Sequence, residues 1–307
     1  MISLVTGGAG FIGRRLVERL LDDGDRVIVL DDLSSGDGDK LDGRAELVVG
    51  SILDAEALAR ACQGVNRVFH LAAIASVARC NEDLTASHRV NLTGFVGLLE
   101  ILAQGASRPA LVYASSAAVY GDNPEVPLLE TAGPRPLSPY GADKLGCELH
   151  AAAAAAVYGL NSTGFRFFNV YGPGQDPSSP YSGVISRFVE KMMRGEPVVL
   201  HGDGLQTRDF VFVDDVVDAL VRGSARQPDP SARVYNVCTG RETTIRQLAE
   251  MLREQIGSKA EITSGPTRPG DIRRSIGSLA RGRDELGLKA PTSLDQGLKL
   301  LVEAMRA

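Results

Sequence analysis

Apolar runs rich in β-branched residues alternate with segments of helical periodicity along the first half of the chain. Each run is short enough for a buried strand, and the segments between them space their apolar positions as helices do. The predicted strands are 2–7, 26–31, 45–50, 65–73, 109–116 and 161–172, and the predicted helices are 11–24, 91–105 and 140–159. Because such alternation is typical of parallel βαβ units, we predict an α/β fold built on a doubly wound, parallel Rossmann-type sheet.

The pattern changes after Tyr171. Residues 172–183 are rich in Gly, Pro and Ser, as loops are, and the segments beyond them are shorter and more mixed. Helices are predicted there at 184–195, 245–257 and 294–306. We therefore expect a smaller, mixed α/β substrate lobe beside the larger domain, with a cleft between them. The expected division is an NAD-binding domain of residues 1–171, to which 203–237 return, and a substrate lobe of 172–202 and 238–307.

The composition narrows the class of protein. With 307 residues, 44% apolar and 23% charged, the chain has the profile of an ordinary globular protein of about two domains. Its formal net charge of −5 argues against binding to nucleic acid or to a membrane surface. The four cysteines are scattered without a CxxC pair, so we expect buried free thiols in a reducing cytoplasm and no metal site. Neither a signal peptide nor a membrane-spanning run is visible.

A glycine-rich turn joins the first predicted strand to the first predicted helix. In "TGGAGFIG", Gly7 permits a tight turn, Gly10 lets the backbone approach a pyrophosphate, and Gly13 allows close helix–sheet packing. The triplet alone is equally consistent with a simple turn. The second strand, however, ends in Asp31, eighteen residues after Gly13. A carboxylate there can bind the adenosine ribose and would repel the extra phosphate of NADP. We therefore predict NAD, the alternative being that Asp31 is a solvated turn residue.

A tyrosine and a lysine lie four residues apart at the start of a predicted helix. In "SPYGADK", Tyr140 and Lys144 share one helix face. A phenol ordinarily has a pKa of about 10, too high for a base at neutral pH. A nearby ammonium and a positively charged nicotinamide ring lower the pKa of a phenol. The alternative is a packed tyrosine beside a surface lysine, but the pair follows the glycine turn and the strand-end Ser116, and this joint match is much more specific than the pair alone.

Together these positions resemble the extended short-chain dehydrogenase/reductase superfamily. The motifs that carry the resemblance are Gly7, Gly10, Gly13, Asp31, Ser116, Tyr140 and Lys144. Further segments resemble its nucleotide-sugar epimerase branch, specifically the UDP-glucose/UDP-galactose 4-epimerases. They are "RFFNVYGPGQDPSSPYSG" (166–183), "GDGLQTRDFVFVDDV" (202–216) and "RPGD" (268–271). The resemblance extends over nearly the whole chain and implies an NAD-dependent enzyme. It also implies a homodimer built on helices 91–105 and 140–159.

The resemblance assigns roles to individual residues. Tyr140 would be the base, Lys144 would bind the nicotinamide ribose and tune Tyr140, and Ser116 would bond to the sugar 4-OH. The implied cofactor residues are Gly7, Gly10, Phe11, Ile12, Gly13, Asp31, Asp32, Ser51, Ile52, Leu71, Ala72, Ala73, Asn91, Ser115, Tyr140 and Lys144. Asn91 matches an asparagine near the cofactor in relatives, and its simpler role is a helix cap. Ser51 and Ile52 stand where relatives carry Asp-Ile or Asp-Leu against the adenine.

The implied substrate residues lie in the later motifs. Asn169 would hold the sugar or diphosphate, while Val184 and Ile185 would line the uracil pocket. Arg208 and Arg268 would clamp the diphosphate, a task that suits the guanidinium group. The alternative, a surface salt bridge, is credible for either arginine alone but less so for two arginines that both lie in matched motifs. Asp271 would bind the uridine ribose.

The residues after the fifth strand bear on the reaction. Dehydratases and UDP-sugar decarboxylases of the superfamily carry acidic groups there, whereas this chain has Ala117 and Ala118. Without a positioned acid and base, elimination lacks its catalyst. The reaction that remains once elimination is set aside is epimerisation, which consists of oxidation at C4, rotation of the 4-keto sugar and reduction on its other face. The sequence therefore favours an epimerase.

The choice of sugar rests on fewer residues. Ser275 stands where a bulky tyrosine excludes N-acetyl groups in relatives, so we expect UDP-GlcNAc and UDP-GalNAc to be accepted besides UDP-glucose and UDP-galactose. UDP-glucuronate epimerisation is an alternative, although its enzymes tend to carry an arginine in the loop after Asn169, where this chain has Asp176. The rival class, a non-catalytic NAD-binding protein, usually lacks the pair of Tyr140 and Lys144.

Overall fold

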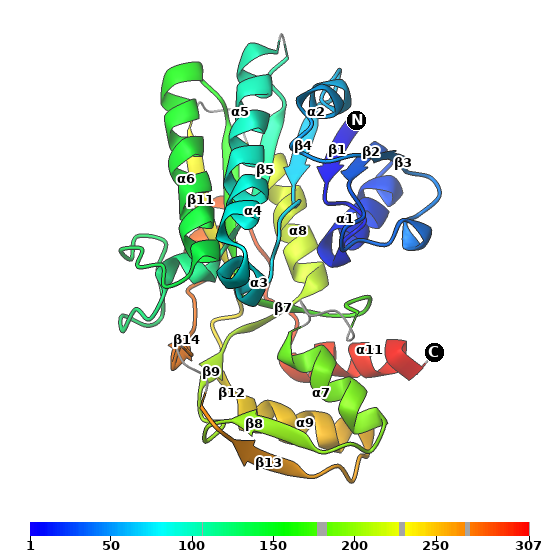
Figure 1. The fold of residues 1–307 in the computed structure, drawn as a ribbon, viewed down its shortest axis with the longest axis vertical. Helices are drawn as coiled ribbons and strands as arrows, with labels where there is room; N and C mark the ends of the chain where they lie inside the picture. Colours follow the sequence, from blue (N-terminus) through cyan, green and yellow to red (C-terminus); the bar gives the residue numbers. More distant parts are fainter. Residues whose placement is uncertain (106, 177–182, 227–230, 268–270, 307) are drawn as a thin grey trace.

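A seven-stranded sheet forms the centre of the molecule in this computed structural model (Figure 1), which describes residues 1–105, 107–176, 183–226, 231–267 and 271–306. Every neighbouring pair is parallel, in the order β11-β6-β5-β4-β1-β2-β3. The strands are β1 (Ile2–Thr6), β2 (Arg26–Asp31), β3 (Glu46–Val49), β4 (Arg67–His70), β5 (Ala110–Ser116), β6 (Ser162–Phe167) and β11 (Ala232–Val237). The predicted doubly wound Rossmann-type sheet is confirmed.

Helices cover both faces of this sheet. They are α1 (Phe11–Asp22) and α8 (Val213–Ser224) on one face, and α2 (Ala55–Ala61), α5 (Gly94–Gln104) and α6 (Pro139–Tyr158) on the other. Consecutive residues of one strand belong to apolar cores on opposite faces of the sheet. Leu4 packs under α5 and α6, whereas Val5 packs under α1 and α8. Strands buried on both faces have no polar side, which explains the continuous apolar runs in the sequence.

A second group of elements lies below the sheet in Figure 1 and has its own apolar core. Its strands are β7 (Asn169–Tyr171), β8 (Val198–His201), β9 (Thr207–Arg208), β10 (Phe210–Phe212), β12 (Thr243–Thr244), β13 (Ile262–Gly265) and β14 (Arg274–Ser275). Its helices are α7 (Val184–Met193), α9 (Ile245–Ile256) and α11 (Leu294–Arg306). The helix α10 (Ala280–Leu286) packs instead against β11 and α8. The division of the chain into an NAD-binding domain and a substrate lobe stays a prediction.

The last strand predicted for the first half, 161–172, is divided in two. β6 stays in the seven-stranded sheet, whereas β7 pairs with β10 in a separate two-stranded sheet. Phe168 is the one residue between them, and it is 5% exposed. The sequence pattern could not show this division, because Phe168 continues the run between the two strands and is itself buried.

Short elements follow β4 and β5. They are α3 (Val77–Glu82), α4 (Leu84–His88), the π-helical turn η2 (Arg89–Thr93) and the 3-10 helix η3 (Ala117–Tyr120), with a further 3-10 turn η1 (Gly38–Lys40) after β2. The predicted helix 91–105 therefore begins with a π-helical turn. The four cysteines are free and buried, as the sequence predicts. Within the described residues, no helix is long and apolar enough to cross a bilayer.

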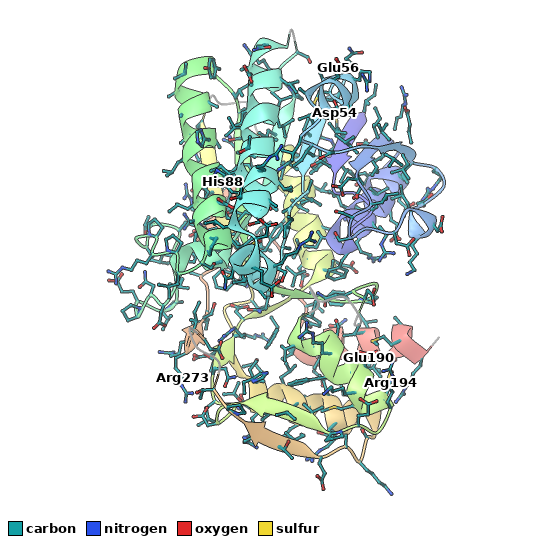
Figure 2. All side chains as sticks on the ribbon, in the orientation of Figure 1. Asp54, Glu56, His88, Glu190, Arg194 and Arg273 are labelled. Carbon is teal, nitrogen blue, oxygen red and sulfur yellow. The ribbon has the colours of Figure 1, made fainter. Side chains whose placement is uncertain are left out.

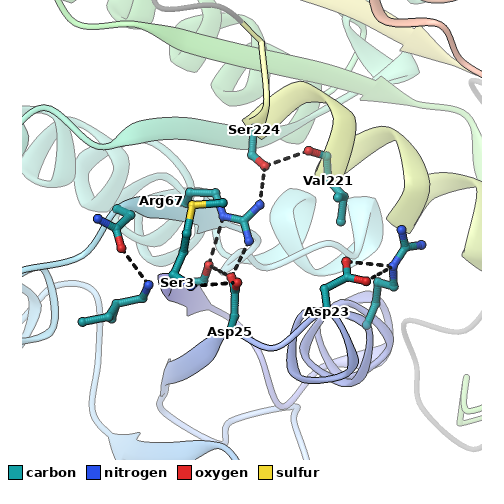
Figure 3. Close-up of polar contacts among 10 residues, drawn as sticks. Ser3, Asp23, Asp25, Arg67, Val221 and Ser224 are labelled. Atoms are coloured by element: carbon teal, nitrogen blue, oxygen red, sulfur yellow. Dashed lines mark hydrogen bonds and ion pairs between the residues drawn. The ribbon is translucent and has the colours of Figure 1, made fainter.

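A buried ion pair closes the amino-terminal edge of the sheet (Figure 3). Arg67 pairs with Asp25, and its guanidinium also donates to the hydroxyls of Ser3 and Ser224 at 3.2 and 3.1 Å. Ser3 in turn donates to Asp25 at 2.6 Å. Although burial favours the neutral acid, the hydrogen bonds from Ser3 and Arg67 outweigh it and lower the pKa of Asp25. Polar contacts therefore hold the amino ends of β1 and β4 together, whereas ligands of open α/β sheets bind at the carboxyl ends of the strands.

Candidate active site

The carboxyl ends of β1 and β4 are the switch point of the sheet, where the strand order reverses direction. Ligands of open α/β sheets bind in the crevice outside such a point. Gly7 follows β1 with φ +73°, and a Cβ there would lie 2.6 Å from the backbone nitrogen of Ala72. A Cβ on Gly13 would lie 2.2 Å from the carbonyl oxygen of Gly7. The turn is thus closed to larger residues and leaves the N-terminus of α1 open to a pyrophosphate, as NAD requires.

Asp31 supports the glycine turn from β2. It is 8% exposed, and its two carboxylate oxygens accept one bond each from the backbone nitrogens of Ala9 and Leu33, both at 2.9 Å. Burial raises the pKa of Asp31 despite these bonds. The alternative of a solvated turn residue is therefore wrong. The neighbouring Asp32 accepts from Ser34 N at 3.0 Å within the following loop.

Tyr140 and Lys144 lie in the first two turns of α6. Ser138 caps this helix by accepting from Gly141 N, and Pro139 occupies its first turn. The Lys144 ammonium lies 5.9 Å from the centre of the Tyr140 ring and donates to the carbonyl oxygen of Ala114 in β5 at 2.9 Å. Lys144 is only 2% exposed, so the alternative of a surface lysine is wrong. The ammonium is fixed between the end of β5 and the tyrosine.

The two serines that end β5 have different partners. Ser116 Oγ accepts from Ala118 N at 3.1 Å, which caps η3. Ser115 Oγ donates to Glu148 Oε1 at 2.5 Å, and Glu148 forms a buried ion pair with Arg166 at 2.6 Å. Successive residues of a strand point to opposite faces. The hydroxyl of Ser115 is thus bonded to Glu148, so the predicted contact of Ser115 with the cofactor would come from the main chain of Ser115.

Asn91 lies inside the π-helical turn η2 and is 1% exposed. Its Oδ1 accepts from Ile74 N at 2.8 Å and its Nδ2 donates to Ile74 O at 3.2 Å. The alternative of a helix cap is therefore wrong. Asn91 holds the loop that follows β4, which contains the predicted cofactor residues Leu71, Ala72 and Ala73. A π-helical turn often marks a functional site, but side-chain periodicity does not reveal one.

Two residues on the adenine side of the predicted cofactor site, Ser51 and Ile52, make contacts within the protein. Ile52 is 7% exposed and lies in the core against α5, where a Cβ on Gly94 would approach its Cδ1 to 2.6 Å. Ser51 Oγ accepts from Leu53 N at 3.2 Å. Phe11 and Ile12 form the first turn of α1 and are half-buried. These residues line the expected route of the cofactor, although their contacts with NAD stay predictions.

Two histidines near Lys144 were not found from the sequence. His70 ends β4 and is hydrogen-bonded to Thr6 Oγ1 at 2.8 Å. Burial and, to a lesser degree, the Lys144 ammonium lower the pKa of His70 to about 3, so the ring is neutral at physiological pH. His88, labelled in Figure 2, is hydrogen-bonded to Asp143 at 2.7 Å and joins α4 to α6. In the sequence, only the position of each histidine at the end of an element could have indicated that it lies near the site.

Three predicted substrate residues meet below the sheet. In the parallel pair of β9 and β14, Arg208 lies opposite Ser275. The Arg208 guanidinium pairs with Asp271 and donates to the carbonyl oxygen of Ile272 at 2.7 Å. Arg268 lies outside the described residues, so its prediction has no structural counterpart.

The other predicted substrate residues lie on β7 and α7. Asn169 is exposed at the start of β7. Val184 begins α7 and is half-buried, whereas Ile185 is 2% exposed in the lower core. A contact of Ile185 with a uracil ring would therefore come from its main chain.

Asp209 is a buried carboxylate beside the predicted substrate residues, and sequence reasoning did not single it out. It is fully buried and accepts from the nitrogens of Thr239 and Gly240 at 2.7 and 2.9 Å, from the Thr239 hydroxyl at 2.7 Å, and from Gly277 N at 3.4 Å. Burial raises the pKa of Asp209 in spite of these bonds. The carboxylate ties the segments that carry Arg208 and Ser275 to the end of β11. Its contacts are distant in sequence, which explains why no local motif revealed it.

Comparison with known proteins adds an independent result. Residues 3–238 match the model of the NAD dependent epimerase/dehydratase family. A UDP-glucose 4-epimerase of Mycolicibacterium smegmatis is 39% identical, and the match covers 100% of this chain and 99% of that protein. Among solved structures, the UDP-glucose 4-epimerase of Thermotoga maritima with UDP-glucose has a TM-score of 0.95 and 41% identity, covering 100% of this chain and 99% of that one. A UDP-N-acetylglucosamine 4-epimerase of Methanobrevibacter ruminantium has a TM-score of 0.93 and 33% identity, covering 99% and 97%.

Proposed function

The chain belongs to the NAD-dependent epimerase/dehydratase family, and on that basis we propose that it is a UDP-hexose 4-epimerase that interconverts UDP-glucose and UDP-galactose. The observation that carries the proposal is the buried Lys144 ammonium beside the Tyr140 ring at the end of β5. A base is most effective when a fixed charge adjusts its proton affinity. Ser116 lies at the same strand end and supplies the hydroxyl that would orient the sugar.

The residues of the chain fit NAD. Gly7 and Gly13 exclude side chains from the turn before α1, and Asp31 is held against that turn from β2. NAD, when bound, supplies the acceptor and later the donor of the hydride at C4 of the sugar. Lys144 and Tyr140 would lie on the nicotinamide side of the cofactor, and Asp31 on its adenosine side.

The steps at the sugar then follow from the side chains. The Tyr140 oxygen takes the proton of the 4-OH, while Ser116 holds that oxygen in place. The 4-keto sugar turns about its link to the diphosphate, which Arg208 grips. Tyr140 returns the same proton after the hydride has come back on the opposite face. Ala117 and Ala118 offer no acid or base for elimination, so the keto sugar has no other outcome.

One observation favours a second class of substrate. Ser275 lies opposite Arg208 in the register of β14 and β9, so its small side chain is close to the proposed diphosphate clamp. A serine there leaves room for an N-acetyl group on the sugar. We therefore include UDP-GlcNAc and UDP-GalNAc among the proposed substrates, with UDP-glucuronate as the alternative series.

The proposal extends to assembly and location. On the outer face of α6, Leu149 is 63% and Val157 70% exposed, with Ala153 exposed between them. An exposed apolar stripe of this kind favours burial against a second copy, so we propose a homodimer through α5 and α6, which sedimentation can check. Four free buried thiols suit a reducing compartment, which favours the cytoplasm.

The decisive experiment is a panel of UDP-sugars incubated with purified protein and NAD, with the products separated by chromatography. The panel contains UDP-glucose, UDP-galactose, UDP-GlcNAc, UDP-GalNAc and UDP-glucuronate. We expect interconversion within the glucose and N-acetylglucosamine pairs. Turnover of UDP-glucuronate alone would replace the proposed substrate, and no interconversion of any sugar by NAD-loaded protein would refute the enzyme.

A further inference from the structure

Arg14 connects two parts of the molecule that are far apart in the sequence. It lies in α1 directly after Gly13, and its Nη2 donates to the carbonyl oxygen of Gly174 at 2.8 Å. Gly174 belongs to the segment 172–176 that leaves β7. The contact joins the first turns of the helix behind the glycine turn to the segment that follows Asn169. A charged donor on a neutral carbonyl makes a stronger bond than a neutral pair.

The same segment is fixed on its other side by the next residue. Gln175 Oε1 accepts from Ser186 Oγ at 2.6 Å, and Ser186 is fully buried in α7. Gly174 and Gln175 thus form a short bridge between α1 and α7. In Figure 1, the ribbon that leaves β7 runs between the sheet and α7, which agrees with this bridge. The segment is therefore held from two sides, by α1 at Gly174 and by α7 at Gln175.

The loop after β2 contacts the glycine turn. Asp37 N donates to the carbonyl oxygen of Ala9 at 3.2 Å, which holds the loop after β2 against the turn. Asp37 has its pKa lowered chiefly by Lys40, and the charge of Arg14 contributes in the same direction. Arg14 thus belongs to the helix whose first turn follows the glycine turn, and its guanidinium holds Gly174 next to that helix.

We propose that Arg14 is a positioning residue that holds the segment 172–175 beside the cofactor and slows the release of NAD. The proposal rests on the placement of NAD at the glycine turn. Its chemical rationale is the redox balance of the proposed reaction. An epimerase returns the hydride to the same sugar and has no need to exchange its cofactor, so slow release of NAD does not limit turnover.

The experiment measures NAD release directly, without any sugar. Protein loaded with radiolabelled NAD is mixed with excess unlabelled NAD, and the label retained is followed over time. We expect Arg14→Ser to release NAD about tenfold faster, since the bond to a charged donor is lost. Arg14→Lys, which keeps one charged donor, should recover part of the slow release.

The neighbouring arginine provides a matched control. Arg15 lies on the same helix but bonds to Asp214 at 2.8 Å and to Glu18 at 2.6 Å. Arg15→Ser should release NAD at the wild-type rate and leave epimerisation unchanged. Hydrogen–deuterium exchange supplies a second readout, because the amides of Gly172, Gly174 and Gln175 should exchange faster in Arg14→Ser than in Arg15→Ser.

The proposal is overturned if Arg14→Ser retains NAD as long as the wild type does, or if Arg15→Ser releases it equally fast. The second result would show that the charge of α1, not the bond to Gly174, controls release. Because the release is measured without sugar, these outcomes are independent of whether the protein epimerises a UDP-hexose.

Discussion

Ser275 lies directly opposite Arg208 in the parallel pair of β14 and β9. The pair places a small side chain beside the guanidinium that is proposed to grip the diphosphate. A ring at position 275 would therefore occupy space next to the sugar. We expect Ser275→Tyr to lower kcat/KM for UDP-GlcNAc at least about tenfold, a loss typical of a steric misfit in a binding pocket. UDP-galactose turnover should stay near the wild-type value.

Parallel assays with both sugars separate this steric effect from general damage. Ser278→Tyr is the matched control, because it adds the same ring three residues away along the chain. Equal loss of both activities in Ser275→Tyr would contradict the specificity role.

Tyr140→Phe removes the proposed base while keeping the ring beside Lys144. We expect kcat to fall at least about a hundredfold, because a positioned acid–base group contributes on that order. The amount of NAD bound per chain, measured by absorbance after denaturation, should not change. Tyr158→Phe is the control, since Tyr158 lies at the exposed end of the same helix. Undiminished turnover in Tyr140→Phe would show that another group takes the proton.

Asp209→Asn should impair the binding of the UDP-sugar without affecting NAD. The carboxylate accepts from three backbone nitrogens and one hydroxyl, and an amide would present a donor to at least one of them. We expect KM for UDP-galactose to rise about tenfold, because the segments that carry Arg208 and Ser275 lose their common anchor. Titration calorimetry with UDP and with NAD distinguishes the two sites.

Asp203 supplies the comparison for this substitution. It is an exposed aspartate, paired with Arg273, and it lies six residues before Asp209. Asp203→Asn should leave KM near the wild-type value. Weaker NAD binding in Asp209→Asn would mean that Asp209 supports the whole molecule and not the substrate side alone.

Asp25 makes the stability of the protein depend on pH. Its folded-state pKa lies below the ordinary value of an aspartate, so the unfolded chain binds a proton more readily. The stabilisation is therefore complete above about pH 4, the ordinary pKa of the unfolded aspartate, and is lost as the pH falls through the lower folded value. Urea unfolding at a series of pH values should show this loss.

Asp25→Asn should remove that part of the pH dependence. It should also lower the free energy of unfolding at pH 7 by about 3 kcal/mol, because Arg67 would remain buried without its ion pair. Asp22→Asn, which disrupts a surface ion pair with Arg44, should have little effect. A pH profile of Asp25→Asn that matches the wild type would contradict the assignment.

The sequence predicts those parts of the fold that depend on local pattern. Six strands of the seven-stranded sheet, the turn at Gly7 and the helix face shared by Tyr140 and Lys144 follow from spacing within one or two elements. The seventh strand, β11, was not predicted from the sequence. What the sequence could not show are contacts between distant segments. Glu148 of α6 and Arg166 of β6 form an ion pair, and Glu148 also accepts from Ser115 of β5, although no local pattern links the three.

The same limit applies to Asn91 and Arg208. Asn91 was expected at the cofactor, and its amide bonds to the backbone of Ile74 and to Cys80 Sγ. Arg208 was expected to face a diphosphate, and it pairs with Asp271. Both expected roles stay predictions, and neither of the observed partners follows from a local pattern in the sequence.

The single residue between β6 and β7 has a mechanical consequence. Phe168 N donates to Val237 O at 3.1 Å, and its ring packs so closely on Gly277 that a Cβ there would lie 2.6 Å away. The chain therefore passes from the sheet to the lower core through a buried, tightly packed residue. We expect this joint to resist bending between the sheet and the lower core. In the proposed reaction, the half-turn of the 4-keto sugar would then come from the torsions of its own diphosphate link.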